Sequence, residues 1–296
     1  MKKNIVHIGF PRSASTFIQD SFFPKVKKMD YLGKPHSKEI HLAMRNLNYL
    51  DNESYLESKA SEVLKSAVKE KPIIISNEGI SHAELGTSIT QDPYVIAKRL
   101  REIFGDATII IIIREQLNWF ESYYLRRTKS YLMGGLFQSP NEFFFNHYHS
   151  PGNGVLGRID YLKIYKSFKK VFSDVEIIPY EELKFDRELF IEKLINIVGE
   201  KISIDDFKPI NVKTTKLRIL FGYMNRLIIP GILTFPFKFA PKKIKKKWIN
   251  FLEKGPKAKI NFSNKIKNIM AEIFSESNKK LNEIKNLNLD KYDYFL

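Results

Sequence analysis

The chain has 296 residues, of which 43% are hydrophobic, so it can bury a sizeable core, and we expect one domain over 1–296. It contains no cysteine, which excludes disulfide-stapled folds and thiolate metal sites and favours a reducing compartment. The formal net charge is +16, and 13 of these charges lie in 213–296, where 17 Lys and 2 Arg stand against 6 Asp or Glu. We therefore expect 212–296 to be a basic, mostly helical portion of that domain.

The first element is a short apolar strand over 4–9, which runs into a hydroxyl-rich turn that opens a helix. The turn consists of Pro11, Arg12, Ser13, Ala14, Ser15, Thr16 and Phe17. It aims several backbone N–H groups at one point, which suits a phosphate or sulfate. A Walker A loop counted from Gly9 would need glycine and lysine where Ala14 and Ser15 stand. Arg12 instead places a cation where charge builds on a leaving oxygen, although the hydroxyl groups could also serve only as helix caps.

The remaining elements alternate between strands and helices. We expect strands at 72–76, 108–113 and 174–179, and helices at 93–104, 116–133, 158–171 and 187–198. This order is typical of an α/β fold with a parallel central sheet covered by helices on both faces. The polar segment 31–50 and the glycine-rich segment 134–157 are expected to be loops over the carboxyl edge of the sheet, where an acceptor binds. The aromatic cluster 143–149 fits either that site or core packing.

Polar residues follow two of the predicted strands. Glu78 comes after the strand 72–76, and His82 lies four positions later. Arg114 ends the β-branched strand 108–113, and the next helix carries Ser122. Ligands of open α/β sheets bind beyond the carboxyl ends of the strands, so these positions are candidates for a site. Arg114 could equally be a solvated strand boundary, and Ser122 could lie on the helix surface.

Together these segments resemble the sulfotransferases that use 3′-phosphoadenosine 5′-phosphosulfate (PAPS). The stretch 9–17 looks like the 5′-phosphosulfate loop of that family, and Arg114 with Ser122 looks like its 3′-phosphate site. The stretch 175–183, with a Tyr-Glu-Glu turn that begins at Tyr180, resembles a later strand and turn of the family. The tail 278–296 is similar to the ends of many bacterial members. The resemblance implies the P-loop-kinase-like sulfotransferase fold.

The chain departs from the family pattern at three places. Ala14 replaces the usual loop glycine, which puts in doubt a backbone with positive φ at that position. Glu78 stands where the cytosolic small-molecule enzymes carry a histidine, as in the branches that use glutamate as the base. The Arg-Lys-Gly clamp of those enzymes is absent, and we expect 211–218, which includes Lys213 and Thr214, to take its place.

The resemblance implies transfer of the sulfuryl group from PAPS to an acceptor hydroxyl, with 3′,5′-ADP as the other product and no metal. Glu78 would be the general base, and His82 is the reserve candidate. Arg12 and the N–H groups of the loop would hold the sulfate and the leaving oxygen. Phe17 is placed like the family aromatic that stacks on adenine, and Tyr180 would line the same pocket. We expect the acceptor to be a glycan or glycolipid.

Two other classes compete with this interpretation. A P-loop kinase or nucleotide-binding protein would need a loop lysine and a Mg²⁺-binding acid at a strand end, whereas Asp106 precedes its strand. A non-catalytic protein that binds polyanions or membranes would rely on the basic portion alone. Nucleic acid would suit the charge, but the chain carries no reading motif, and we expect no such partner.

The chain start and the basic portion bear on location. The first strand begins at once, which leaves no room for a cleavable signal, and we expect a cytoplasmic protein. The apolar stretch 227–239 is short and broken by proline, so it does not suit a bilayer span. With the lysines of 242–247 and Trp248 it could lie on an anionic membrane, which would make the protein peripheral. Alternatively, the lysines form a solvated helix.

Overall fold

The computed structural model describes residues 3–33, 37–81, 91–131, 137–150, 154–203, 214–227 and 241–296. They belong to two compact units. The first unit contains Met1–Glu115, Gly157–Pro209 and Ile273–Leu296, and the second contains Gln116–Leu156 and Ile210–Glu272. Each unit is assembled from separate stretches of the chain, and the single domain over 1–296 stays a prediction.

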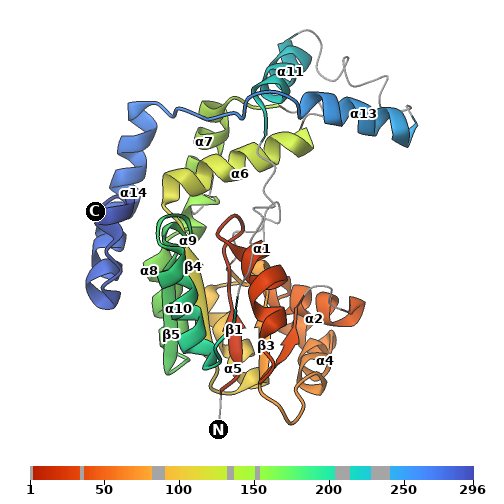
Figure 1. Cartoon of the computed structure of the whole chain (residues 1–296), viewed down its shortest axis with the longest axis vertical. Coiled ribbons are helices and arrows are strands. Elements are labelled where there is room, and N and C mark those ends of the chain that lie inside the picture. The colour runs from red at the N-terminus through yellow and green to blue at the C-terminus, as the bar shows by residue number, and fades with distance from the viewer. Residues whose placement is uncertain are drawn as a thin grey trace. The chain divides into compact units, whose positions relative to one another are not determined.

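A five-stranded sheet forms the centre of the first unit (Figure 1). Its order is β2-β3-β1-β4-β5, and every neighbouring pair is parallel. The strands are β1 (Ile5–His7), β2 (Asp30–Leu32), β3 (Ile73–Ser76), β4 (Thr108–Ile113) and β5 (Asp174–Pro179). All six residues of β4 are buried, as expected for a β-branched strand in a parallel sheet that is covered on both faces. The predicted α/β fold with a parallel sheet is confirmed.

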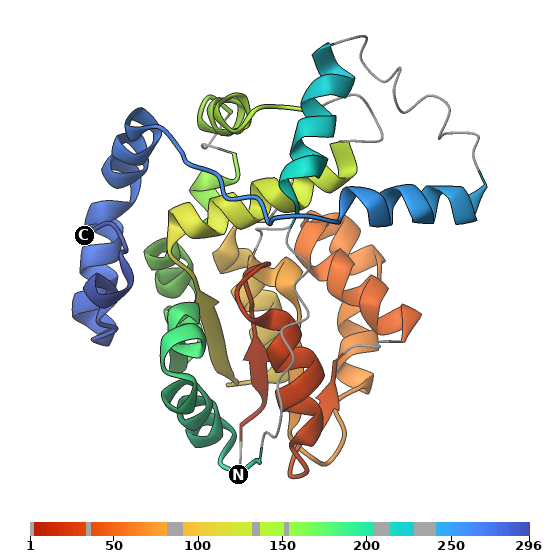
Figure 2. The ribbon, with the colours of Figure 1, turned by 45° about the horizontal axis from the view of Figure 1, so that its top comes forward.

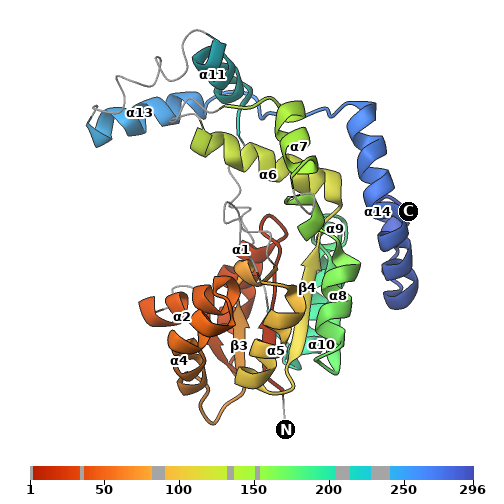
Figure 3. The same ribbon diagram turned by 180° about the vertical axis from the view of Figure 1, so that it is seen from behind.

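Helices cover both faces of this sheet. One face carries α1 (Ser15–Phe17), the π-helix η1 (Ile18–Phe22), the 3-10 turn η2 (Phe23–Lys25) and α10 (Arg187–Val198), which share one apolar core with the sheet (Figure 2). The opposite face carries α5 (Pro93–Phe104) and α8 (Tyr161–Lys169), as the view from behind shows (Figure 3). The shorter elements of this unit are α3 (Asn52–Glu57), α4 (Ala60–Ser66), η3 (Glu78–Ser81), α9 (Tyr180–Phe185) and η6 (Leu289–Tyr292).

The expectation that 31–50 is a loop was wrong. This stretch contributes to β2 at the edge of the sheet and then forms α2 (Lys38–Tyr49). The side chain of Ser37 caps the helix by accepting a hydrogen bond from the N–H of Ile40, 3.2 Å away. Ala43, Met44 and Leu47 are buried on one face of the helix. Apolar residues at helical spacing with polar residues between them are the pattern of an amphipathic helix, which the interpretation of this stretch as a polar loop overlooked.

The described part of the second unit is helical. It contains α6 (Gln116–Tyr131), α7 (Pro140–Tyr148), α11 (Lys216–Leu227), α13 (Lys242–Leu252) and the first residues of α14 (Asn264–Lys285), and η5 (Leu156–Arg158) lies at its boundary. The expected loop over 134–157 therefore includes a helix, which starts with a capping box between Ser139 and Glu142. Phe143 and Phe144 are buried, and their rings lie 5.5 and 5.6 Å from that of Phe120. Of the two interpretations of the aromatic cluster, core packing holds for these two side chains.

The basic C-terminal portion is mostly helical where it is described, as predicted. The later part of α14 and the tail that follows belong to the first unit. There Lys285 Nζ donates to the carbonyl oxygen of Val175, 3.1 Å away, and pairs with Glu176 at 3.2 Å. Ser277 Oγ donates to the carboxylate of Asp160, which also caps α8. These contacts hold the tail along the β5 side of the sheet.

Candidate functional site

Parallel pairing brings four predicted site segments to one edge of the first unit. β3 and β4 lie on opposite sides of β1, and β5 lies beyond β4. Because all strands point the same way, Glu78 after β3, the loop after β1, Arg114 after β4 and Tyr180 after β5 follow one another along the carboxyl edge. Neighbouring strands are about 4.8 Å apart, so side chains from adjacent strands can reach one ligand.

The loop after β1 has a strained backbone. Ile8 N–H donates to the carbonyl of Ile110 at 2.9 Å, and Ser13 N–H donates to the carbonyl of Phe10 at 3.1 Å, which closes the turn. Arg12 and Ala14 then adopt positive φ angles of 72° and 58°. Such a conformation costs about 1–3 kcal/mol at a residue other than glycine. The backbone that the missing glycine put in doubt is therefore present at Ala14, and the surrounding structure holds it.

A buried polar network lies next to this loop. His7 Nδ1 is 2.7 Å from Ser76 Oγ, and Gln19 Nε2 donates to the same oxygen at 2.9 Å. Burial lowers the pKa of His7 to about 3, so its ring is neutral at physiological pH. A Cβ atom on Gly9 would lie 2.6 Å from Cε1 of that ring, which explains the glycine at this position. The network thus joins β1, β3 and η1 next to the loop.

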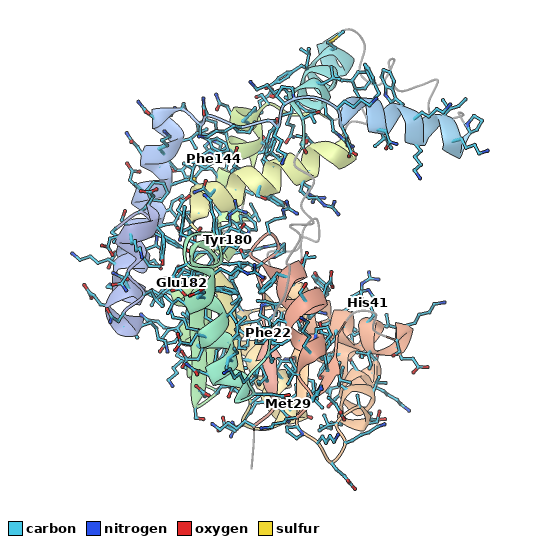
Figure 4. All side chains as sticks on the ribbon, in the orientation of Figure 1. Phe22, Met29, His41, Phe144, Tyr180 and Glu182 are labelled. Atoms are coloured by element: carbon cyan, nitrogen blue, oxygen red, sulfur yellow. The ribbon has the colours of Figure 1, made fainter. Side chains whose placement is uncertain are left out.

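Arg114 is fixed between the loop and α9. Its Nη1 donates to the carbonyl oxygen of Arg12 at 2.9 Å, and its guanidinium lies 5.0 Å from the centre of the Tyr180 ring. Tyr161 Oη donates to the carbonyl oxygen of Arg114 at 2.5 Å, and burial raises the pKa of Tyr161 well above its usual range, so it stays a donor. Figure 4 labels Tyr180 at the start of α9.

The C-terminal tail supports the same junction. Glu181 Oε1 accepts a hydrogen bond from the N–H of Glu115 at 3.1 Å, and Tyr294 Oη donates to Glu181 Oε2 at 3.0 Å. Burial raises the pKa of Glu181, and the hydrogen bonds from Glu115 N–H and Tyr294, with the nearby charge of Arg114, oppose that shift. Tyr161, Glu181 and Tyr294 were not among the predicted site residues. The closing Asp-Lys-Tyr-Asp-Tyr pattern was the available signal, but only the fold shows what Tyr294 touches.

Glu78 opens η3 on the other side of the loop. Asn77 N–H donates to the carbonyl of His7 at 3.1 Å, which extends the pairing of β1 and β3 by one bond. Gly79 N–H donates to Asn77 Oδ1 at 2.8 Å, and Ser81 Oγ donates to the carbonyl of Glu78 at 2.9 Å. The backbone at Glu78 is thus fixed while its side chain is half-buried. His82 lies outside the described residues.

The loop side chains differ in exposure. Pro11, Ser13 and Ser15 are buried, and Arg12, Ala14 and Thr16 are half-buried. Phe17 is 1% exposed and packs in the apolar core, with its ring 6.2 Å from that of Phe190. Its observed role is core packing, because no face of the ring is open to a ligand. Stacking of Phe17 on adenine stays a prediction that this packing does not favour.

The other predicted contacts belong to the second unit. Ser122 lies half-buried on α6. Thr214 is buried, and its Oγ1 donates to the carbonyl oxygen of Leu125 at 2.8 Å. Its hydroxyl hydrogen is therefore already in a hydrogen bond within the second unit. Lys213 lies outside the described residues. That these residues complete a site with Arg114 stays a prediction.

The edge of the first unit has the chemistry that an anionic ligand needs. Two cationic side chains, Arg12 and Arg114, belong to it, and the loop adds hydroxyl groups. Ser13 Oγ and Arg114 Nε are buried and have no hydrogen-bond partner among the described residues. Buried polar atoms normally have partners, so these two fit a ligand that carries several oxygen acceptors, such as a phosphate.

No family model matches the chain, and no curated protein does. Among solved structures, a sulfotransferase from Alicyclobacillus acidocaldarius aligns with a TM-score of 0.56 at 11% identity, over 99% of each chain. The chain has the sulfotransferase fold. A mouse sulfotransferase complexed with PAP aligns with a TM-score of 0.47 at 13% identity, over 97% of this chain and 89% of that one. A sulfotransferase domain from the curacin biosynthetic pathway aligns with a TM-score of 0.39 at 14% identity, over 92% and 98%.

The strain at Ala14 can be tested directly. Glycine adopts positive φ without steric cost, so Ala14→Gly should raise the free energy of unfolding by about 0.5–1 kcal/mol. The matched control is Ala97→Gly in the interior of α5, which should lower it by about 1 kcal/mol or more. Urea unfolding of both variants measures the difference. Equal destabilisation by the two substitutions would show that Ala14 is not strained.

Proposed function

We propose that the protein transfers a sulfuryl group from PAPS to a hydroxyl group of an acceptor. The observation that carries the proposal is the hydrogen bond between Arg114 and the carbonyl of Arg12, because it joins the strained loop to a cation at one sheet edge. The sulfotransferase fold supports this activity over other uses of an anion site. The loop also lacks the lysine of a Walker A motif.

Different residues at the carboxyl edge would bind different parts of the nucleotide. Arg12 and the N–H groups of 13–16 would hold the 5′ side, as loops of this kind hold anions. Arg114 would hold the 3′-phosphate, with Ser122 as its proposed partner, and Tyr180 would line the pocket. When bound, PAPS supplies an activated sulfuryl group and 3′,5′-ADP as the leaving group.

Glu78 and Arg12 would act on opposite sides of the transfer. The acceptor oxygen forms a bond to sulfur while the bond from sulfur to the phosphate oxygen breaks, which gives a sulfate ester and 3′,5′-ADP. Glu78 takes the proton of the acceptor hydroxyl, for which hydrogen-bond reach matters most. Arg12 stabilises the negative charge that appears on the departing oxygen. The two residues follow neighbouring parallel strands, which suits this division.

A kinase function is less well supported. The candidate acid, Asp106, lies before β4 and therefore at the amino edge of the sheet. Its carboxylate accepts a hydrogen bond from Ser173 Oγ at 2.6 Å and pairs with Lys3 at 3.0 Å, and these contacts lower its pKa. Asp106 thus joins segments at the amino edge of the sheet, at the opposite end of the strands from the loop after β1.

For the acceptor, we propose a glycan or glycolipid, which suits the basic second unit.

Nucleotide selectivity tests the proposed 3′-phosphate contact. 3′,5′-ADP should raise the melting temperature without Mg²⁺, and 5′-AMP should raise it much less. Losing a charge-assisted contact to a buried phosphate costs about 1.5–3 kcal/mol, so Arg114→Ala should weaken 3′,5′-ADP binding about 10- to 150-fold. Calorimetric titration measures both affinities.

The control for this experiment is Arg101→Ala. It removes the same charge from α5, where Arg101 pairs with Asp106 at the opposite edge. This variant should bind 3′,5′-ADP normally. If both nucleotides stabilise the unmutated protein equally, or if Arg101→Ala weakens binding as much as Arg114→Ala, the assignment of the 3′-phosphate to Arg114 is wrong.

Turnover separates the two proposed catalytic residues. Arg12→Ala should lower the rate about 10²–10³-fold, as for loss of one donor to developing charge. Glu78→Gln should lower it about 10²–10⁴-fold and leave 3′,5′-ADP affinity nearly unchanged, because only the proton acceptor is lost. Release of 3′,5′-ADP from PAPS, with a panel of glycans, glycolipids and phenols, provides the measurement.

Glu102→Gln is the matched control, since Glu102 is exposed on α5 and pairs with Lys65 at 3.0 Å. It should keep full activity. Near-normal turnover of Glu78→Gln, together with loss of activity in His82→Ala, would move the role of base to His82. If both variants stay active, neither residue is the base.

A further inference from the structure

The second unit exposes apolar side chains on two helices. They are Leu220 (55% exposed) and Met224 (45%) on α11, and Ile244 (50%) and Phe251 (50%) on α13. These four are the exposed large hydrophobic side chains among the described residues of the unit. We call them the α11–α13 surface. Leaving such side chains in water is unfavourable, so a cluster of them indicates a binding surface.

The spacing places these side chains in two stripes. Leu220 and Met224 are four residues apart on α11, and Ile244 and Phe251 are seven apart on α13, so each pair lies on one side of its helix. Trp248 connects the helices: its ring stacks on that of Phe251 at 5.5 Å and meets that of Phe221 on α11 at 5.4 Å. These ring contacts pack α13 against α11.

The same helices carry positive charge. Lys243, Lys246 and Lys247 are exposed on α13, and Lys216 is exposed on α11. Neither helix contains an acidic residue. Glu253, directly after α13, pairs with Arg218 at 2.8 Å, so its charge is compensated within the unit. The charged side chains that these two helices carry beside their apolar residues are therefore all cationic.

We propose that the α11–α13 surface docks the protein on the surface of an anionic lipid bilayer. Amphipathic helices with lysines beside apolar and aromatic residues lie in the membrane interface, with the apolar side about 5–10 Å deep. Lysines add electrostatic attraction to anionic headgroups. A soluble polyanion would engage the lysines but would leave Ile244 and Phe251 in water. An anionic bilayer satisfies both kinds of side chain.

The geometry fits a protein that lies on a membrane. With 11 residues, α13 is too short to cross a bilayer, which takes about 20. None of the described helices has the length and apolar character of a membrane span. The α11–α13 surface belongs to the second unit alone, so docking on a bilayer does not depend on whether the first unit transfers sulfuryl groups.

Vesicle sedimentation of the full chain tests the proposal. The protein should bind vesicles of phosphatidylcholine with phosphatidylserine and bind pure phosphatidylcholine far more weakly. Ile244→Ser with Phe251→Ser should lower the affinity for the anionic vesicles at least about tenfold, because two apolar side chains no longer enter the interface. Lys243→Gln with Lys247→Gln should lower it about 25-fold at low salt, or about fivefold per lysine.

Two matched double variants serve as controls. Leu56→Ser with Ile284→Ser removes exposed apolar side chains of the first unit, and Lys267→Gln with Lys279→Gln removes two exposed charges from α14. Both should bind vesicles like the unmutated protein. Circular dichroism confirms that all variants are folded.

Three outcomes would overturn the proposal. The first is the absence of vesicle binding. The second is vesicle or heparin binding that depends on Lys243 and Lys247 but not on Ile244 and Phe251, which would indicate a polyanion site. The third is a change from dimer to monomer in Phe251→Ser, which would show that a second copy of the chain covers the surface.

Discussion

The hydrogen bond from Arg114 to the carbonyl oxygen of Arg12 is the contact on which the candidate site depends. The backbone of Arg12 is constrained at two points. Its φ of 72° turns the loop, and its carbonyl oxygen accepts a hydrogen bond from the guanidinium of Arg114, directly after β4. Arg114 is in turn held by Tyr161 at its own carbonyl and by the Tyr180 ring. One bond therefore couples the loop after β1 to the strand beside it. The guanidinium of Arg114 is thus held against the loop backbone without a ligand, which reduces the ordering that binding would require.

The strained backbone of the loop after β1 is stabilised by hydrogen-bonded contacts on both sides of it. Two residues other than glycine hold positive φ, and such strain persists only where neighbouring contacts determine the backbone. The neutral, buried His7 with Ser76 and Gln19 provides those contacts on one side, and the chain from Tyr294 through Glu181 to Glu115 provides them on the other. The C-terminal tail thus acts on the site although it lies at the far end of the sequence. This is a physical reason for the tail to pack on the β5 side rather than end in solvent.

Local patterns predicted the parts of the fold that depend on local physics. The apolar run of β4, the helix α10 and the turn after β1 all lie where the sequence predicted them. The strand β2 was missed because it is stabilised by pairing with β3, which no short window of sequence contains. The helix α2 has local signals in its cap and its apolar spacing, and the interpretation of 31–50 as a polar loop overlooked them. The packing of Phe17 on Phe190 and the hydrogen bond from Tyr294 to Glu181 were also not predicted, because each joins segments that lie far apart in the sequence. Glu78, the loop and Arg114 could be predicted because parallel strands place their carboxyl ends together.

A crystal structure of the protein with 3′,5′-ADP tests the central claim most directly. The account predicts that the 5′-phosphate lies against the backbone N–H groups of 13–16, and that the 3′-phosphate accepts hydrogen bonds from the guanidinium of Arg114. Ser13 Oγ and Arg114 Nε, which have no partner among the described residues, should then gain one. Nucleotide bound away from the carboxyl edge of the sheet, or bound there with its 3′-phosphate out of reach of Arg114, would contradict the account.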